Sequence, residues 1–305
     1  MMSFLLALSL ILPVLSFTPP TSSPPLTYTS YGTSTSNPPI IMLHGLLGNS
    51  KNFASIAPLL STSHSRLVIS LDLPDHGSES NWGEEEEEVI TYPLMSKCVV
   101  DFLDWAGIET CTVIGHSMGG KVAMAMATDP VYQGRLEGLV VIDIAPVTYE
   151  AGDGTDWSTI ETIISTCTSL PLSTLPTKKS ADDYLSKNIP SPSLRSFILT
   201  NLSSSKTGDR SDDRSSSSLT WKIPILKIKN SLKTLASFPP PTTPYPGDAY
   251  FITGGNSKYV RLIYKKNIEE CFERYMITTI RGSGHWCHAE SPADVVDLVG
   301  RYFDR

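Results

Sequence analysis

The chain has 305 residues, 40% of them hydrophobic, and a formal net charge of −7. This length is typical of one α/β domain with an insertion. The acidic balance, which no Lys or Arg cluster reverses, argues against a nucleic-acid binder or a protein that binds anionic membranes. The five cysteines form no C-x-x-C pair. Cys98 and Cys111 lie in apolar patterns, which predicts buried thiols rather than a disulfide framework.

Residues 1–24 are predicted to be a signal or targeting segment outside the fold. The apolar run at 4–15 is short for a membrane span and is typical of the core of a cleavable signal peptide, although no Lys or Arg precedes it. The Ser/Thr/Pro-rich stretch at 16–25 is a linker or a second targeting signal. The expected localisation is therefore the secretory pathway or an organelle reached through it, without a membrane span in the mature chain. A buried N-terminal helix is the alternative.

Apolar runs alternate with helical patterns along the rest of the chain. Strands are expected at 26–31, 39–43, 66–73, 110–114, 139–144, 249–253 and 275–280. Helices are expected at 49–60, 92–105, 121–128, 260–272 and 292–303. Continuous apolar strands separated by helices predict a mostly parallel sheet that is covered on both faces. Functional sites in such sheets lie at the carboxyl ends of the strands, which here hold Gly45, Leu46, Asp72, Ser117, Asp143, Ser257 and His285.

The pattern changes between residues 147 and 245. Helical fragments at 156–166, 180–187 and 193–202 carry apolar faces that need a surface to cover. We interpret 147–245 as a helical cap inserted into a core formed by residues 25–146 and 246–305. The Ser-rich stretch at 202–219 has too few apolar residues to order itself and predicts a disordered loop. The acidic run at 84–88 predicts a solvated loop.

A G-x-S-x-G motif occupies residues 115–119, between an apolar strand and a helix of small residues. Strand, sharp turn and helix form the context that a nucleophile elbow needs, and the two glycines allow the strand and the helix to approach closely. Ser117 is therefore the predicted nucleophile. The backbone N–H of Met118, at the helix N-terminus, is a predicted donor to an oxyanion. An ordinary strand-to-helix turn is the alternative.

His285 is the predicted general base, because it follows the last strand after a Gly-Ser-Gly loop. The alternative is a loop histidine without a catalytic role. A metal site built from His285, Cys287 and His288 would need a further ligand and matches no usual zinc spacing. The other histidines near motifs are interpreted as residues that pack beside the site or shape it: His44, His76, His116 and His288.

The acid that would orient His285 is predicted to be Asp143. No carboxylate follows the second-last strand at 254–257, whereas Asp143 ends the strand after the motif helix. A charge in this apolar strand is costly to bury without a partner, and pairing with His285 would supply one and fix the imidazole tautomer. The alternatives are an Asp that binds loop amides, or an acid from the cap.

The second oxyanion donor is predicted to be the backbone N–H of Leu46, which lies in the His-Gly-Leu-Leu-Gly loop at 44–48. The side chain of Leu46 offers an apolar wall in that position. The alternative is a loop residue that only packs on the cap.

The order of these motifs resembles the α/β-hydrolase superfamily. Blocks at 44–49, 142–147, 251–257 and 284–289 are similar to the branch of the mitochondrial α/β-hydrolase domain protein eleven and related bacterial esterases. The resemblance covers about residues 27–304 and implies an α/β-hydrolase fold whose acid is on the strand that carries Asp143. The Ser-rich stretch departs from this branch, and the N-terminus is not the Arg-rich presequence of a mitochondrial protein, so the mitochondrion is the alternative localisation.

These residues predict a serine hydrolase that cleaves esters or thioesters through an acyl-enzyme. The apolar cap favours an acyl or lipid-like substrate, and acyl transfer in the same site stays open. A Ser nucleophile disfavours the dehalogenase and epoxide-hydrolase chemistries of this fold, which use Asp. The competing hypothesis is a non-catalytic binding or scaffolding protein on the same fold. The sequence carries no cofactor motif and no signal of oligomeric state.

Overall fold

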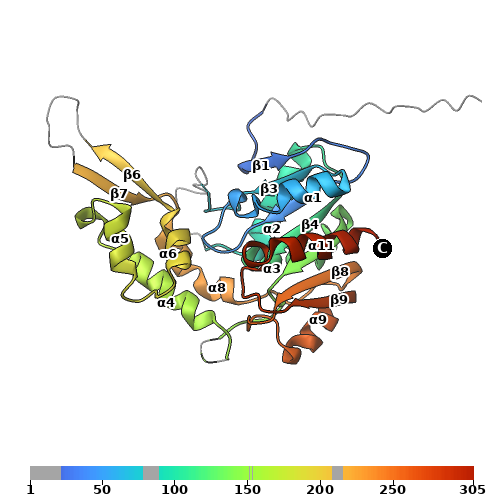
Figure 1. Cartoon of the computed structure of the whole chain (residues 1–305). Helices are drawn as coiled ribbons and strands as arrows, with labels where there is room; N and C mark the ends of the chain where they lie inside the picture. Colours follow the sequence, from blue (N-terminus) through green and yellow to red (C-terminus); the bar gives the residue numbers. More distant parts are fainter. Residues whose placement is uncertain (1–21, 78–88, 151, 153, 208–215) are drawn as a thin grey trace, which may run out of the picture.

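The computed structural model describes residues 22–77, 89–150, 152, 154–207 and 216–305 (Figure 1). Most of the predicted targeting segment, and all of the acidic run at 84–88, lie outside these residues. No helix in the described part of the chain combines the length and the apolar character that crossing a bilayer requires.

Seven strands of the described residues form one central sheet in the order β1-β3-β2-β4-β5-β8-β9. They are β1 (Tyr28–Tyr31), β2 (Ile40–Leu43), β3 (Val68–Leu71), β4 (Cys111–His116), β5 (Leu136–Ile142), β8 (Tyr245–Gly254) and β9 (Phe272–Ile280). The edge strand β1 pairs antiparallel with β3, and the other neighbours are parallel. The prediction of a mostly parallel sheet is confirmed.

The central strands are apolar throughout because helices cover both faces of the sheet. Ile41 and Leu43 of β2 pack into one core cluster, and Ile40 and Met42 pack into the other. Figure 1 shows the helices of the two faces. The first face carries α2 (Tyr92–Trp105) and α3 (Met118–Ala127), and the second carries α1 (Ala57–His64) and α11 (Pro292–Phe303).

Short helical turns complete the core. They are η1 (Ser50–Phe53), η2 (Gln133–Arg135), η4 (Leu262–Tyr264), α9 (Lys265–Cys271) and α10 (Cys287–Glu290). The helix expected over 49–60 divides into η1 and α1. Pro58 lies in the first turn of α1, where its missing N–H costs no hydrogen bond. Asn49 caps η1, since its side chain accepts a hydrogen bond from the N–H of Lys51.

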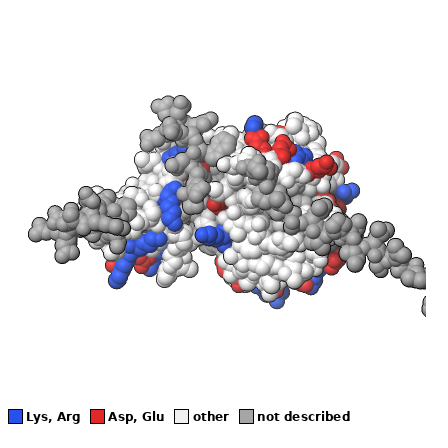
Figure 2. Space-filling view, turned by 90° about the horizontal axis from the view of Figure 1, so that it is seen from above, with Lys and Arg blue, Asp and Glu red and all other residues white. Residues whose placement is uncertain are grey.

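The described residues within 147–244, which we call the β5–β8 segment, lie beside the sheet rather than within its layers (Figure 1). The segment contains α4 (Trp157–Thr168), η3 (Leu172–Thr174), α5 (Lys178–Leu185), α6 (Pro192–Leu199), β6 (Leu202–Thr207), β7 (Ser216–Trp221), α7 (Ile225–Asn230) and α8 (Leu232–Ala236). Figure 2 shows Lys and Arg side chains spread over the left part of its face, where this segment lies, and a group of Asp and Glu side chains over the right part, where the core lies.

The prediction of a disordered loop over 202–219 is wrong at both ends of that stretch. β6 and β7 pair antiparallel as a hairpin. Backbone hydrogen bonds do not require apolar side chains, and the buried Leu202 and Leu219 supply a small apolar contribution. The remainder, 208–215, lies outside the described residues.

Polar contacts attach the β5–β8 segment to the core at several places. Lys227 of α7 forms a buried ion pair with Asp75, whose charged atoms are 3.0 Å apart. Lys121 of α3 is also buried, and its Nζ donates to three carbonyl oxygens of the segment at 2.7–2.9 Å. Burial lowers the pKa of Lys121 well below its usual value. Three carbonyl acceptors nevertheless require three N–H donors, so the geometry favours the ammonium form.

Candidate active site

Ser117 occupies the tight turn between β4 and α3. Its backbone has φ 52° and ψ −118°, which is uncommon for a residue with a side chain. A Cβ on Gly115 would overlap the Gly119 carbonyl, and a Cβ on Gly119 would overlap the Leu43 carbonyl. Glycine at both positions therefore allows α3 to start directly above the end of the sheet.

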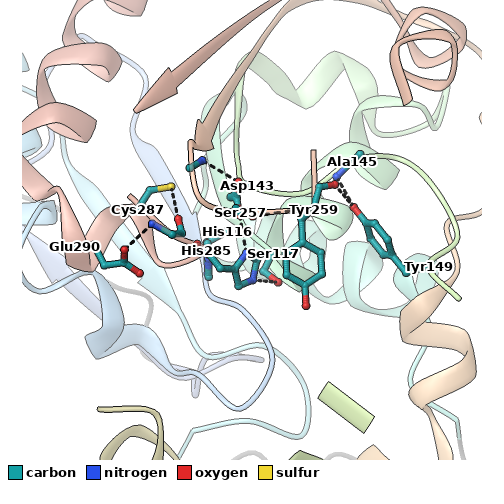
Figure 3. A network of polar contacts seen from close by, with 12 residues as sticks. His116, Ser117, Asp143, Ala145, Tyr149, Ser257, Tyr259, His285, Cys287 and Glu290 are labelled. Carbon is teal, nitrogen blue, oxygen red and sulfur yellow. Dashed lines mark hydrogen bonds and ion pairs between the residues drawn. The ribbon is translucent and has the colours of Figure 1, made fainter. Parts of the chain in front are cut away.

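A chain of hydrogen bonds connects Ser117, His285 and Asp143 (Figure 3). The Oγ of Ser117 lies 3.0 Å from Nε2 of His285, and Nδ1 of His285 lies 2.7 Å from Oδ2 of Asp143. A carboxylate only accepts hydrogen bonds, so these partners assign the ring hydrogen to Nδ1. Nε2 is then free to accept the hydroxyl hydrogen.

The sheet brings these residues together from distant parts of the chain. Ser117 follows β4, Asp143 follows β5, and His285 lies in the loop after β9. Asp143 has φ 53°, and its backbone N–H donates to the carbonyl of Ile252 at 2.9 Å. The bend after β5 thus turns the carboxylate toward the ends of β8 and β9.

Two further donors hold the carboxylate of Asp143. The N–H of Gly254 donates to Oδ1 at 2.9 Å, and the hydroxyl of Ser257 donates to Oδ2 (Figure 3). The carboxylate is completely buried, and its ionised form is stabilised by these donors together with His285. The sequence pattern places Ser257 at the end of a strand, in a stretch without a carboxylate, but it assigns no role to this residue. Its position after a strand was the available signal.

The loop that carries His285 is anchored on three sides. Nε2 of His116 donates to the His285 carbonyl at 2.9 Å, and the N–H of Gly284 donates to Glu290 at 2.6 Å. The rings of Tyr259 and His285 have centroids 4.3 Å apart. The hydroxyl of Tyr149 donates to the carbonyl of Tyr259 at 2.7 Å, and this hydrogen bond holds Tyr259 beside the ring of His285. No sequence pattern indicated Tyr149, Tyr259 or Glu290.

His116 and His288 lie beside the site as buried rings. Their centroids are 4.4 Å apart, and His116 also contacts the ring of His285. Burial, followed by repulsion from the neighbouring histidines, lowers the pKa of His116 well below its usual value. Burial and His285 lower the pKa of His288 to about 4. Both rings are therefore neutral at pH 7 and pack against the site, as the sequence predicts.

His44 and His76 shape the loops at the other side of the site. Nε2 of His44 accepts from the N–H of Leu73 at 3.0 Å, and its Nδ1 donates to the Gly45 carbonyl at 2.8 Å. Burial is the main cause that lowers the pKa of His44, and that of His76 falls to about 3. Two neutral histidines thus support the turn that carries Leu46.

Leu46 and Met118, the residues of the two expected oxyanion donors, line one cavity together with Ser117. Among the described residues, neither the N–H of Leu46 nor that of Met118 has a hydrogen-bond acceptor. The loop of Leu46 is held by a hydrogen bond from the N–H of Gly119 to the His44 carbonyl at 3.0 Å. Asn201 of the β5–β8 segment adds a second support, because its Nδ2 donates to the Leu47 carbonyl at 2.8 Å.

Two cavities meet at Ser117. The larger has a volume of about 380 Å³ and is lined by Gly45, Leu46, Asn52, His116, Ser117, Ile160, Ser193, Leu194, Phe197, His285, Trp286, His288, Ala289 and Glu290. The smaller has a volume of about 30 Å³ and is lined by Leu46, Tyr92, Ser117, Met118, Lys121, Ile144, Tyr149, Trp157, Ile160, Leu235 and Tyr259. The helices α4 and α6 therefore direct their apolar residues toward Ser117.

Comparison with known proteins agrees with this architecture. The chain is 32% identical over 280 residues to the sn-1-specific diacylglycerol lipase ABHD11 of Xenopus laevis, covering 92% of this chain and 84% of that protein. It is 29% identical over 269 residues to Esterase YbfF of Escherichia coli, covering 88% and 94%. Both similarities extend over the core and the β5–β8 segment.

A marine microorganism esterase of known structure superimposes with a TM-score of 0.79 and 28% sequence identity, covering 92% of this chain and 99% of that one. Residues 38–292 match the family described as alpha/beta hydrolase fold. The sheet order, the turn at Ser117 and these similarities lead to one conclusion. The chain belongs to the α/β-hydrolase family.

Proposed function

We propose that Ser117, His285 and Asp143 form the catalytic triad of a serine hydrolase that acts through an acyl-enzyme. Ester cleavage is the activity of this chain, as it is of the esterases and lipases that it resembles. The observation that carries the assignment is the continuous hydrogen-bond chain from Ser117 Oγ to the buried carboxylate of Asp143. A merely structural His285 would not need its free Nε2 to face a hydroxyl in a strained turn.

In the acylation step, Ser117 Oγ attacks the carbonyl carbon of the ester while Nε2 of His285 accepts the hydroxyl proton. The negative charge that develops on the carbonyl oxygen is stabilised by the N–H groups of Leu46 and Met118. Asp143 keeps the ring hydrogen on Nδ1 and stabilises the imidazolium. His285 then donates its Nε2 proton to the departing alcohol or thiol.

In the deacylation step, water takes the place of the leaving group. His285 removes a proton from this water, which attacks the acyl carbon, and the same two N–H groups stabilise the second oxyanion. Proton return to Ser117 releases the carboxylic acid and restores the resting enzyme. The anchors of the His285 loop, above all Tyr259, hold the ring in place through both steps.

The β5–β8 segment serves as the cap that covers this site. Its Ile160, Leu194 and Phe197 supply apolar walls to the larger cavity, which favours acyl or lipid-like esters and thioesters. The frog relative's name specifies a diacylglycerol lipase, a substrate class compatible with such walls. The similarity of this chain to the ABHD11 proteins fits the mitochondrial alternative for its localisation. The secretory route stays a prediction.

The experiment is to label the purified protein with a fluorophosphonate beside Ser117→Ala and to measure hydrolysis of 4-nitrophenyl esters. Ser193→Ala is the matched control, because Ser193 lines the larger cavity without contacting the triad. We expect labelling and hydrolysis in the wild type and in Ser193→Ala, and neither in Ser117→Ala. A folded wild type that is neither labelled nor active would favour the non-catalytic binding protein.

A further inference from the structure

We propose that the smaller cavity binds the acyl group and restricts it to a short chain of about two or three carbons, whereas the larger cavity binds the alcohol or thiol portion. This inference rests on the proposed function and names its substrate class, short-chain acyl esters or thioesters of a bulky alcohol or thiol. It depends on the position of the two cavities relative to the proton donor and on their sizes.

The two cavities have different chemical neighbours. Ser117, Leu46 and Ile160 line both, so the reacting carbonyl lies at their junction. His285 lines only the larger cavity, and Met118 lines only the smaller one. The general acid and one proposed oxyanion donor thus line different cavities, which share Ser117.

This difference decides which part of the ester enters which cavity. The leaving oxygen or sulfur must receive the proton from Nε2 of His285, so the group attached to it extends along the side that His285 lines. The acyl substituent then enters the other cavity, which Met118 lines and His285 does not. The larger cavity therefore receives the leaving group and the smaller cavity receives the acyl chain.

The volume of the smaller cavity sets the chain length. One water-sized group needs about 10–15 Å³ of such space, so about 30 Å³ holds two or three carbon atoms. The larger cavity, at about 380 Å³, lies within the roughly 300–1,000 Å³ that small-molecule sites occupy. Asn52 and Glu290 add polar groups to its walls, which suits a leaving group with hydroxyl or amide functions.

The walls of the smaller cavity cannot expand easily, because side chains of the core hold them. Trp157 is buried and stacks on Tyr149 with centroids 6.3 Å apart. The hydroxyl of Tyr92 donates to the Leu235 carbonyl at 2.6 Å. The Nζ of Lys121 is bonded to three carbonyls and cannot swing away without breaking them. A longer acyl chain would have to displace this packed wall.

The test uses the full-length protein and 4-nitrophenyl esters that differ only in their acyl chain: acetate, propionate, octanoate and palmitate. We expect kcat/KM for acetate and propionate to exceed that for octanoate at least about 10-fold, the order of discrimination that a few methylenes can give in a tight pocket. A preference for octanoate or palmitate would overturn the assignment of the cavities. If that preference occurred with Ser117-dependent labelling intact, the proposed function would stand. If nothing were labelled or hydrolysed, both proposals would fall.

A pair of variants localises the effect. Trp157→Ala enlarges only the smaller cavity, and we expect it to raise the ratio of octanoate to acetate activity about 10-fold or more. Phe197→Ala, in the wall of only the larger cavity, should leave that ratio unchanged and instead alter the preference between 2-naphthyl and methyl acetate. The proposal would be contradicted if Phe197→Ala changed the ratio of octanoate to acetate activity and Trp157→Ala instead changed the preference between 2-naphthyl and methyl acetate. Trp157→Leu keeps an apolar wall and tests the same ratio if Trp157→Ala does not fold.

Discussion

The core and the β5–β8 segment differ in how they place residues around Ser117. In the core, Ser117, Asp143 and His285 follow neighbouring regions of one hydrogen-bonded sheet, so each side chain inherits its position from a strand end. The segment reaches the same site through side chains such as Asn201 and Lys227 and through the carbonyls that Lys121 binds. If the proposed function holds, the chemistry at Ser117 depends on the core, whereas the size of the accepted substrate depends on how the segment is attached.

Substitutions in the two regions should therefore have different effects on turnover, stability and selectivity. A change at Ser117, Asp143 or His285 should abolish turnover while the fold persists, because the sheet does not depend on their catalytic groups. A change at the attachment of the segment should first lower stability or alter selectivity.

The largest effect is expected from Asp143→Asn. An amide in place of the carboxylate favours the wrong tautomer of His285, and in the Ser-His-Asp enzymes this change lowers kcat by about 10⁴-fold. We expect a loss of that order in ester hydrolysis, measured by steady-state kinetics, with a thermal midpoint that shows a folded protein. Near-normal turnover would place the acid elsewhere.

Asp72→Asn is the matched control for this measurement. Asp72 is also a buried carboxylate after a strand, but it accepts from the N–H of Ser50 and the hydroxyl of Thr27 rather than from a histidine. Its substitution should lower stability and leave kcat within about 10-fold of the wild type. Equal losses in both variants would show that burial, rather than contact with His285, explains the effect of Asp143→Asn.

Lys121→Met should mainly destabilise the attachment of the segment. The variant removes the Nζ donor from the carbonyls of Val147, Ala236 and Ser237, of which Ala236 keeps the N–H of Tyr149, and we expect the free energy of unfolding to fall by roughly 3 kcal/mol. Urea denaturation measures this loss. Lys97→Met is the control, because Lys97 is exposed and forms a surface ion pair with Asp101, so its loss of stability should be much smaller. Equal stability of the two variants would refute the role of Lys121.

The smallest expected effect concerns His288 and acid. Its pKa of about 4 in the folded state lies below the usual 6.5, so the unfolded chain binds the proton more readily and stability falls as pH drops through this window. The loss of stability that this shift causes, relative to neutral pH, reaches about 2 kcal/mol at about pH 5. His288→Phe cannot titrate and should lose less stability between about pH 7 and pH 5 than the wild type, as measured by urea denaturation. Parallel losses would disprove this linkage.

Much of the fold could be predicted from the sequence, because strand and helix periodicities are local. The continuous apolar runs of β2, β4 and β5 require a sheet that is covered on both faces, and such sheets place their sites at the strand ends. Ser117, His285 and Asp143 could be named as candidates because of their places in the chain. Ser117 and Asp143 directly follow strands, and His285 lies in the loop after the last strand. The two glycines of the turn could also be interpreted from the sequence, because a side chain at either position would keep the strand and the helix apart.

The tertiary structure alone decided the features that depend on distant contacts. The hydroxyl of Ser257 meets Asp143, and Tyr259 meets His285, only because β8 lies between β5 and β9. The ends of the Ser-rich stretch form a hairpin because the two strands pair with each other through backbone hydrogen bonds. The composition of either end does not indicate this pairing. The sizes of the two cavities likewise follow from how the segment packs on the core, which no local pattern encodes.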